Sequence, residues 1–418
     1  MLRANIVLAL LTLSMQYYCY GVFGLSAKSL TANLLPKATE SISTYNNFFI
    51  IFAIAAFSKP IGSTILSTIG DKYGKIKALR LSAILAFAAN CTIAFAPSYA
   101  SAGIVSIFAL LIGRMLLMSI VGGELDGVRL YLTELLPNKS YIVGGLVALS
   151  TQIGMLFASV VAIIANDSNY YFYNWRYNFV IGAIFTLIIL LIRSYSKETE
   201  KFLAYKYTKQ HAVFKNISLF TIFEKQRDNI LRLIIINGCI GCGYHLHLIF
   251  SSLYLRDILK LDSLTEYFSY NFIAIFIHMG GALIAGIMSE KIKAKRLFII
   301  LAFVSNILIN CLTCLSFFYD SKLIFVTNML DSFLMPFISV PIFIYIQEKL
   351  IYGSRYRVIS ISHALGSTLF SATSPLICGL LYQHTEISAM PYLYFILLLI
   401  LAFVAFVSFV AKDDIIVT

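Results

Sequence analysis

Among the ionisable residues inside apolar runs of this 418-residue chain, three have types that suggest two kinds of chemistry. Lys59 and Arg114 can bind a carboxylate, because an ammonium group and a guanidinium group are strong donors to anions. Glu124 can carry a proton, which is the usual role of a carboxylic acid inside a membrane. Each such charge in a membrane costs about 2.5–3.5 kcal/mol by insertion scales, so each must serve a function or have a partner.

A structural interpretation stays open beside the functional one for each of these residues. Lys59 either anchors a carboxylate or pairs with another helix. Arg114 either donates two hydrogen bonds to a carboxylate or braces its helix against a neighbour. Glu124 either couples transport to proton movement or stays permanently paired with a basic residue such as Lys59 or Arg114.

Two further patterns suggest ligand chemistry but also have ordinary explanations. Tyr18 belongs to a tyrosine-rich stretch that can form an aromatic wall for a quaternary amine, although 33 Phe and 26 Tyr make aromatic clusters common in this chain. Cys239, Cys242, His245 and His247 are all metal-ligand types, but a continuous helix rarely closes a tetrahedral site at this spacing. We therefore expect no metal and no other cofactor.

The composition identifies the class of protein to which these residues belong. Hydrophobic residues make up 59% of the chain and charged residues 12%, whereas soluble domains contain about 45–50% and about 25%. So few charges cannot cover such an apolar surface in water, which excludes soluble enzymes, nucleic-acid-binding proteins and disordered chains. No catalytic motif is visible either. The sequence predicts a polytopic protein embedded in a lipid bilayer.

Helices that cross a bilayer need about 20 apolar residues, because each residue rises about 1.5 Å through about 30 Å of hydrocarbon. We predict an all-α protein with two six-helix halves, residues 1–194 and 229–418, joined by a cytoplasmic linker at 195–228. The twelve predicted spans are 5–25, 46–69, 78–97, 103–134, 140–165, 177–194, 229–253, 268–288, 297–318, 322–346, 356–382 and 389–411.

The distribution of basic residues predicts the orientation of the chain. With both termini in the cytoplasm, 23 of the 32 Lys and Arg residues fall on the cytoplasmic side and six on the opposite side. The other three are Lys59, Arg114 and Arg129, inside helices. Because basic loops stay in the cytoplasm, we expect both termini to be there.

An internal repeat relates the two halves. Residues 70–72, Gly-Asp-Lys, are echoed by residues 289–291, Ser-Glu-Lys, and residues 131–134, Tyr-Leu-Thr-Glu, are echoed by residues 345–348, Tyr-Ile-Gln-Glu. Transporters built from two parallel six-helix repeats bind their substrate between the halves, near the middle of the membrane.

Residues 59–77, which end in Gly70-Asp71-Lys72-Tyr73-Gly74-Lys75-Ile76-Lys77, resemble the hallmark of the major facilitator superfamily. That hallmark is roughly Gly-x-x-x-Asp-(Arg/Lys)-x-Gly-(Arg/Lys)-x-(Arg/Lys) after a glycine-rich helix end. The alternative is a short solvated loop whose lysines only set the topology. The resemblance implies alternating access and a cytoplasmic gate, in which Glu134 pairs with Lys75 or Lys77. The implied gate residues are Gly70, Asp71, Lys72, Gly74, Lys75, Lys77 and Glu134.

The stretch from Arg114 to Glu134 also resembles the signature of the metabolite:H+ symporters, the subfamily of proline/betaine and α-ketoglutarate permeases. This resemblance implies cation-coupled uptake of a small organic solute. The chain departs from the subfamily in helix 1, where residues 16–20, Gln-Tyr-Tyr-Cys-Tyr, lack the usual pair of acids. Asp126 and Arg129 are additional charges, spaced to form a local ion pair on one helical face.

We predict a monomeric transporter of the bacterial inner membrane that imports a small carboxylate-bearing solute together with protons. Lys59, Arg114, Glu124 and Tyr18 would bind the solute, and Glu124 would couple transport to protons. The missing acids of helix 1 leave an uncoupled exchanger or facilitator open as an alternative. A sensor that binds solute without moving it is a second alternative.

Overall fold

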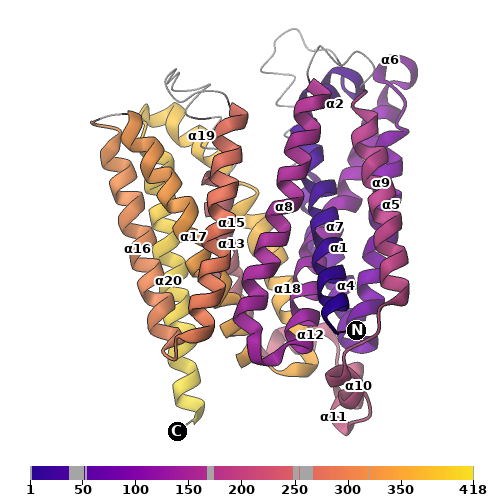
Figure 1. Cartoon of the computed structure of the whole chain (residues 1–418), viewed down its shortest axis with the longest axis vertical. Helices are drawn as coiled ribbons and strands as arrows, with labels where there is room; N and C mark the ends of the chain where they lie inside the picture. The colour runs from indigo at the N-terminus through magenta and orange to yellow at the C-terminus, as the bar shows by residue number, and fades with distance from the viewer. Residues whose placement is uncertain are drawn as a thin grey trace. The chain divides into compact units, whose positions relative to one another are not determined.

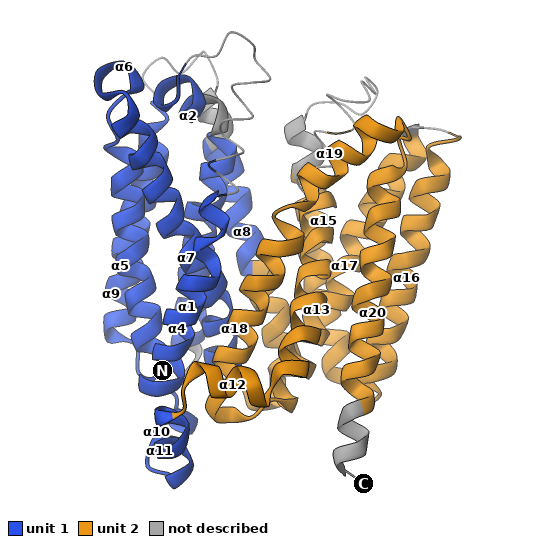
Figure 2. Cartoon of the chain, turned by 180° about the vertical axis from the view of Figure 1, so that it is seen from behind, with its two compact units in different colours: residues 1–135, 150–216 blue, residues 136–149, 217–418 orange. Residues whose placement is uncertain are grey.

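The computed structural model describes residues 2–36, 51, 54–166, 174–247, 254, 267–319 and 321–417. All regular secondary structure within these residues is helical (Figure 1). The helices group into two compact units (Figure 2), one of residues 1–135 and 150–216 and one of residues 136–149 and 217–418. The division runs through helix α8, whose first ten residues group with the second unit.

The first unit contains five long helices and several short ones. Its elements are α1 (Leu2–Leu25), α2 (Ala27–Leu34), α4 (Ser58–Tyr73), α5 (Lys75–Ala94), α6 (Tyr99–Ala102), α7 (Ile104–Leu135), most of α8 (Ser140–Asn166), α9 (Arg176–Tyr195), α10 (Glu200–Lys206) and α11 (Lys209–Asn216). At about 1.5 Å per residue, α7 is about 48 Å long, so it extends beyond the hydrocarbon core. Its C-terminal end can therefore carry charge.

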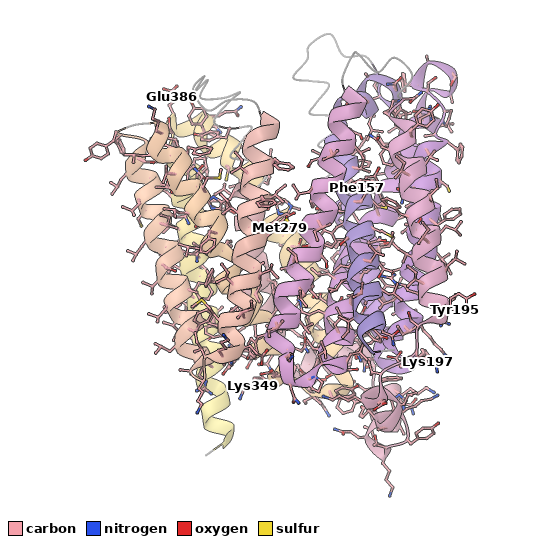
Figure 3. All side chains as sticks on the ribbon, viewed as in Figure 1. Phe157, Tyr195, Lys197, Met279, Lys349 and Glu386 are labelled. Carbon is pink, nitrogen blue, oxygen red and sulfur yellow. The ribbon has the colours of Figure 1, made fainter. Side chains whose placement is uncertain are left out.

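The second unit contains the remaining helices. They are α12 (Leu219–Lys225), α13 (Arg227–His245), α15 (Tyr267–Lys291), α16 (Lys295–Ser316), α17 (Ser321–Lys349), α18 (Arg355–Gly366), α19 (Ser374–Thr385) and α20 (Met390–Val417), with a π-turn at Ser367–Ser371. Lys349 ends α17 and Glu386 follows α19, and the two lie at opposite ends of this unit (Figure 3).

Ten apolar helices in the described residues are long enough to cross a membrane. They are Asn5–Leu25, Lys75–Ala94, Ile104–Leu135, Pro137–Val161, Arg176–Tyr195, Phe272–Lys291, Lys295–Ser316, Lys322–Lys349, Tyr352–Thr385 and Met390–Ala411. Each coincides with a predicted span. The predicted spans 46–69 and 229–253 are not among them, because both run partly into residues outside the described ranges; α4 and α13 occupy their described parts. The total of twelve spans stays a prediction.

Small residues allow α4 and α7 to approach closely. A Cβ atom at Gly62 would lie 1.9 Å from the backbone oxygen of Ser119, and one at Gly123 would lie 2.9 Å from the side chain of Leu66. Close backbone contact between helices through small residues is typical of membrane proteins, where dispersion forces rather than the hydrophobic effect hold helices together. This contact places Lys59 of α4 beside the charged part of α7.

The predicted linker, residues 195–228, is largely helical. It contains α10, α11 and α12, and its first two helices belong to the first unit. Figure 3 shows Tyr195 and Lys197 at the end of the first unit from which α10 and α11 extend. The side chains of Thr199 and Ser218 cap α10 and α12 by accepting hydrogen bonds from backbone N–H groups.

Candidate functional site

Arg114 lies in the middle of α7 and is 1% exposed. Its guanidinium carbon is 4.2 Å from the ring centroid of Phe23 and 5.3 Å from that of Tyr20, both on α1. Cation–π contacts of this kind stabilise a guanidinium where little water reaches it. They hold the planar donor group in one orientation, which is what bidentate binding of a carboxylate requires.

Lys59 is half-buried at the start of α4 and lies within Coulombic range of Arg114 and Asp126. The sequence alone identified both cations but gave no reason to place them together, because they lie on different helices. The structure brings them into one charged region of the first unit.

Asp126 and Arg129 form the predicted local ion pair, with 3.0 Å between the carboxylate and guanidinium. The pair is buried, and it is confirmed as an i,i+3 contact on α7. Lys59 lies within Coulombic range of Asp126 as well as of Arg114.

Glu124 is paired with Arg193 of α9 rather than with Lys59 or Arg114, the partners suggested by the sequence. Both side chains are at most 3% exposed. Arg193 also donates to the backbone oxygen of Leu79 and to the hydroxyl of Ser82. Because a guanidinium stays protonated, this contact favours the permanent pairing of Glu124 that the sequence left open.

Sequence reasoning missed Arg193 because it stands near the predicted cytoplasmic end of its span, where basic residues usually set topology. The structure instead directs its side chain inward, to α5 and α7. The only signal that the sequence offered was Glu124 itself, a buried acid with no cation on the same face of its helix. It indicated that a partner must come from another helix, but it did not say which.

Tyr18 lies in the hydrophobic core of the first unit and is fully buried. Its hydroxyl donates to the backbone oxygen of Asn178 at 2.9 Å, and its ring packs against Phe157 and Phe185. These contacts give Tyr18 a packing role. Tyr20, two residues further on, is the tyrosine whose ring faces Arg114.

The predicted gate motif forms a tight turn between α4 and α5. Gly74 has φ +106°, a conformation that favours glycine, and its N–H donates to the oxygen of Gly70. A Cβ atom at Gly74 would lie 2.3 Å from the carboxylate of Glu198. That carboxylate accepts a hydrogen bond from the N–H of Ile76 at 3.0 Å, near the start of α5, where an anion is favoured by the helix dipole.

Lys75 and Glu134 form the central ion pair of this region, 2.8 Å apart and almost fully buried. The hydroxyl of Thr199 donates to the other oxygen of Glu134 at 2.6 Å. Of the two lysines implied by the resemblance, Lys75 is therefore the partner of Glu134. Lys77 is exposed and lies over the ring of Tyr73.

Asp71 and Lys72 lie in the last turn of α4 and are half-buried. The imidazole of His211 on α11 contacts the backbone oxygen of Lys72 at 3.3 Å. The first part of the linker thus packs against the gate motif. The sequence predicted the motif but not the contact that α11 makes with it.

The second unit contains a buried charged group that sequence reasoning overlooked. His247 and Asp331 form an ion pair, with 2.8 Å between the imidazole Nε2 and the carboxylate Oδ2. Asp331 is a single acid inside the predicted span 322–346. The criterion that identified Glu124 would therefore have identified Asp331 as well.

The histidines of the Cys-x-x-Cys-x-x-His-x-His stretch contact different partners. His245 lies 2.7 Å from the hydroxyl of Ser371, whereas His247 faces Asp331. Within the described residues, no cluster of three or more His, Cys, Asp or Glu side chains is arranged to hold a metal ion.

A family model described as Major Facilitator Superfamily matches residues 9–366. The chain belongs to this superfamily. The resemblance seen in the gate motif is thereby confirmed. Members of the Major Facilitator Superfamily are multi-pass membrane transporters of small solutes, and this protein is accordingly a transporter and not an enzyme.

Two curated relatives of this superfamily member are named as transporters of the same solutes. A putative proline/betaine transporter of Staphylococcus haemolyticus is 26% identical over 392 residues, which cover 89% of this chain and 80% of that protein. The proline/betaine transporter of Salmonella typhimurium is 30% identical over 211 residues, which cover 48% of this chain and 41% of that protein.

Solved structures of the superfamily have the same fold. The proton:xylose symporter XylE, bound to 6-bromo-6-deoxy-D-glucose, aligns with a TM-score of 0.79 at 15% identity, covering 98% of this chain and 96% of that one. The human organic anion transporter MFSD10 aligns with a TM-score of 0.69 at 12% identity, covering 97% and 99%. At such identities the likeness concerns the fold alone.

Proposed function

We propose that this protein imports a small carboxylate-bearing organic solute, an amino acid, a betaine-like osmolyte or a dicarboxylate, by proton-coupled alternating access. It would act as a monomer in the bacterial inner membrane, with both termini in the cytoplasm. The observation that carries the proposal is the buried Arg114 guanidinium, held against two aromatic rings and beside Lys59.

The chemistry of this region fits a carboxylate in two ways. A guanidinium presents parallel N–H donors that match the two oxygens of a carboxylate, and a nearby ammonium adds a second positive charge. The aromatic face of Tyr20 is a surface to which a cationic amine also binds. A zwitterion such as proline or glycine betaine carries both groups, and the names of the relatives are consistent with that class.

The gate is proposed to act through the ion pair between Lys75 and Glu134. Opening the gate would separate these buried charges. The turn that presents Lys75 is formed by the other residues of the predicted motif, Gly70, Asp71, Lys72, Gly74 and Lys77. Glu198 and Thr199 support the pair from the linker. The cost of separating a buried pair would keep the closed form populated until solute binds.

The first experiment is a thermal-unfolding screen of the purified protein against amino acids, betaines and organic acids. A ligand that binds only the folded state raises the unfolding temperature, because it stabilises that state by mass action. We expect a carboxylate-bearing compound, with proline and glycine betaine as first probes, to raise it. The proposed solute class would be contradicted if, of all the compounds tested, only uncharged sugars raised the unfolding temperature.

Transport is then measured in liposomes with variants of Arg114. We expect Arg114→Ala to abolish saturable uptake and Arg114→Lys to restore only a small part, because a lysine keeps the charge but not the planar donor group. Arg227→Ala is the matched control, since Arg227 is 78% exposed in its side chain. Normal uptake by Arg114→Ala would remove Arg114 from the mechanism.

The same liposomes separate the proposal from its two alternatives. Uptake that needs an inward proton gradient supports symport. Uptake and counterflow that are unchanged when the gradient is collapsed would indicate an exchanger or facilitator. Binding in the thermal-unfolding screen without any movement of solute into liposomes would indicate a sensor.

A further inference from the structure

Four elements of the second unit converge on the ion pair of His247 and Asp331. His247 follows α13 directly, and Asp331 and Asn328 lie on α17. Asn310 of α16 donates to Asp331 Oδ1 at 2.7 Å, and the hydroxyl of Tyr392 on α20 donates to Asn328 Oδ1 at 3.1 Å. The side chains of His247 and Asp331 are 2% and 0% exposed.

The hydrogen bonds of Asn328 determine whether Nδ1 of His247 carries a hydrogen. The amide nitrogen of Asn328 donates to the backbone oxygen of Ile324 at 2.9 Å, so its oxygen must be the atom 3.1 Å from His247 Nδ1. An amide oxygen accepts hydrogen bonds and cannot donate one. Nδ1 of His247 therefore carries a hydrogen in this arrangement.

A second proton, on His247 Nε2 or on the carboxyl group of Asp331, is then required to make their 2.8 Å contact favourable. With Nδ1 protonated, a neutral imidazole has only a lone pair at Nε2, and it would repel an ionised carboxylate oxygen at 2.8 Å. The contact is favourable either as imidazolium and carboxylate or as imidazole and carboxylic acid. Both forms hold the same proton and have no net charge.

Loss of this proton changes the charge of the pair to −1. The proton would leave from the imidazolium or from the carboxylic acid, and a neutral imidazole and a carboxylate would remain. A negative charge in hydrocarbon is disfavoured, so release requires water or a cation to reach the carboxylate.

We propose that His247 and Asp331 together carry the proton that is coupled to solute import. The proposal rests on the proposed function and specifies where the proton is bound. Asn328 and Asn310 act as positioning residues, because their amides fix the orientation of the imidazole and of the carboxylate. One proton bound and released by the pair accompanies each transport cycle.

Other titratable groups face the pair from the neighbouring helices. His278 on α15 lies within Coulombic range of both members, and its Nδ1 contacts the backbone oxygen of Ser332 at 3.1 Å. Tyr392 on α20 contacts Asn328 and lies 5.9 Å, ring to ring, from His247. In the described residues, α16 contributes the neutral Asn310 to the contact with Asp331.

The pair differs in kind from the ion pair of Glu124 and Arg193 in the first unit. A guanidinium holds its proton at all physiological pH values, so its pair with a carboxylate stays charged. An imidazole can gain or lose a proton in the physiological range of pH. Both partners of the pair of His247 and Asp331 can therefore exchange protons, whereas the guanidinium of Arg193 cannot.

The first test measures accumulation of proline or glycine betaine in liposomes with the membrane potential held at zero. If one proton accompanies each solute, an inward gradient of about one pH unit drives about tenfold accumulation. We expect Asp331→Asn and His247→Gln to lose this accumulation while counterflow exchange continues, because exchange needs no net proton movement. Asp228→Asn and His384→Gln are matched controls at exposed positions.

The second test requires no known solute and uses protons alone as the probe. Infrared difference spectra of the purified protein between acidic and alkaline buffer should contain carboxyl or imidazole bands from the pair. We expect both Asp331→Asn and His247→Gln to remove the same bands. Thermal unfolding of each variant, with Asp331→Glu as the conservative replacement, establishes that the variants are folded.

The two tests separate failure of this proposal from failure of the proposed function. Gradient-driven accumulation that persists in folded Asp331→Asn overturns the role of the pair but leaves the transporter assignment intact. If the wild type transports neither probe, the infrared spectra still decide whether the pair titrates. Spectra of the wild type and both variants that are identical would also overturn the proposal.

Discussion

The buried ion pairs of the first unit differ in how far apart their two residues lie in the sequence. Asp126 and Arg129 are one helical turn apart, so their contact follows from local geometry. Glu124 and Arg193 come from different helices and are brought together only by packing. Both kinds of pair make buried charge tolerable, but only the second depends on the tertiary fold.

Replacing one member of the pair between Glu124 and Arg193 is expected to destabilise the protein. Arg193→Ala leaves a buried carboxylate without its partner, which typically costs about 3–5 kcal/mol. The double variant Glu124→Gln with Arg193→Gln should recover part of the loss. Thermal unfolding in detergent measures the difference.

The control for this pair is Arg227 with Asp228, whose side chains are 78% and 50% exposed. Asp228→Ala should cost no more than about 1 kcal/mol, as is typical of solvated ion pairs. Equal losses for Arg193→Ala and Asp228→Ala would contradict a buried structural pair.

The backbone of the turn between α4 and α5 restricts which residue can stand at position 74. Gly74 combines a left-handed φ with a close approach to Glu198. The turn presents Lys75 to Glu134 and exposes the first N–H groups of α5 to the carboxylate of Glu198. The element therefore positions both charges of the proposed gate.

Gly74→Ala is expected to disturb this element. A residue with a Cβ atom in the left-handed region costs about 1–3 kcal/mol, and the contact with Glu198 must also shift. We expect a lower unfolding temperature and slower solute uptake. Gly24→Ala is the matched control, because a Cβ atom there meets nothing within 4 Å; the same losses in both variants would exclude a special role for the turn.

At the scale of the whole molecule, the sequence makes a prediction about orientation that the structure leaves open. The distribution of basic residues places Lys72 and Lys291 on the cytoplasmic side and Lys322 on the opposite side. Each unit carries one copy of the internal repeat at the end of a helix, residues 70–72 in α4 and residues 289–291 in α15. Orientation can therefore be tested from each half of the chain.

Cysteine labelling measures this orientation in a variant whose seven cysteines are replaced by serine. An impermeant maleimide added to intact cells should label Lys322→Cys but should label Lys72→Cys and Lys291→Cys only after the membrane is permeabilised. Labelling of Lys72→Cys in intact cells would reverse the topology and with it the proposed cytoplasmic gate.

The sequence by itself determined the membrane class, the superfamily and ten spans that the structure describes as helices. These follow from composition and from patterns within one helix or loop, where the chain geometry is known in advance. Tertiary structure alone decided that Arg193 pairs with Glu124, that Lys75 rather than Lys77 pairs with Glu134, and that His247 meets Asp331. Partners on different helices depend on how the helices rotate and pack, and the hydrophobic pattern of a membrane span does not encode that rotation.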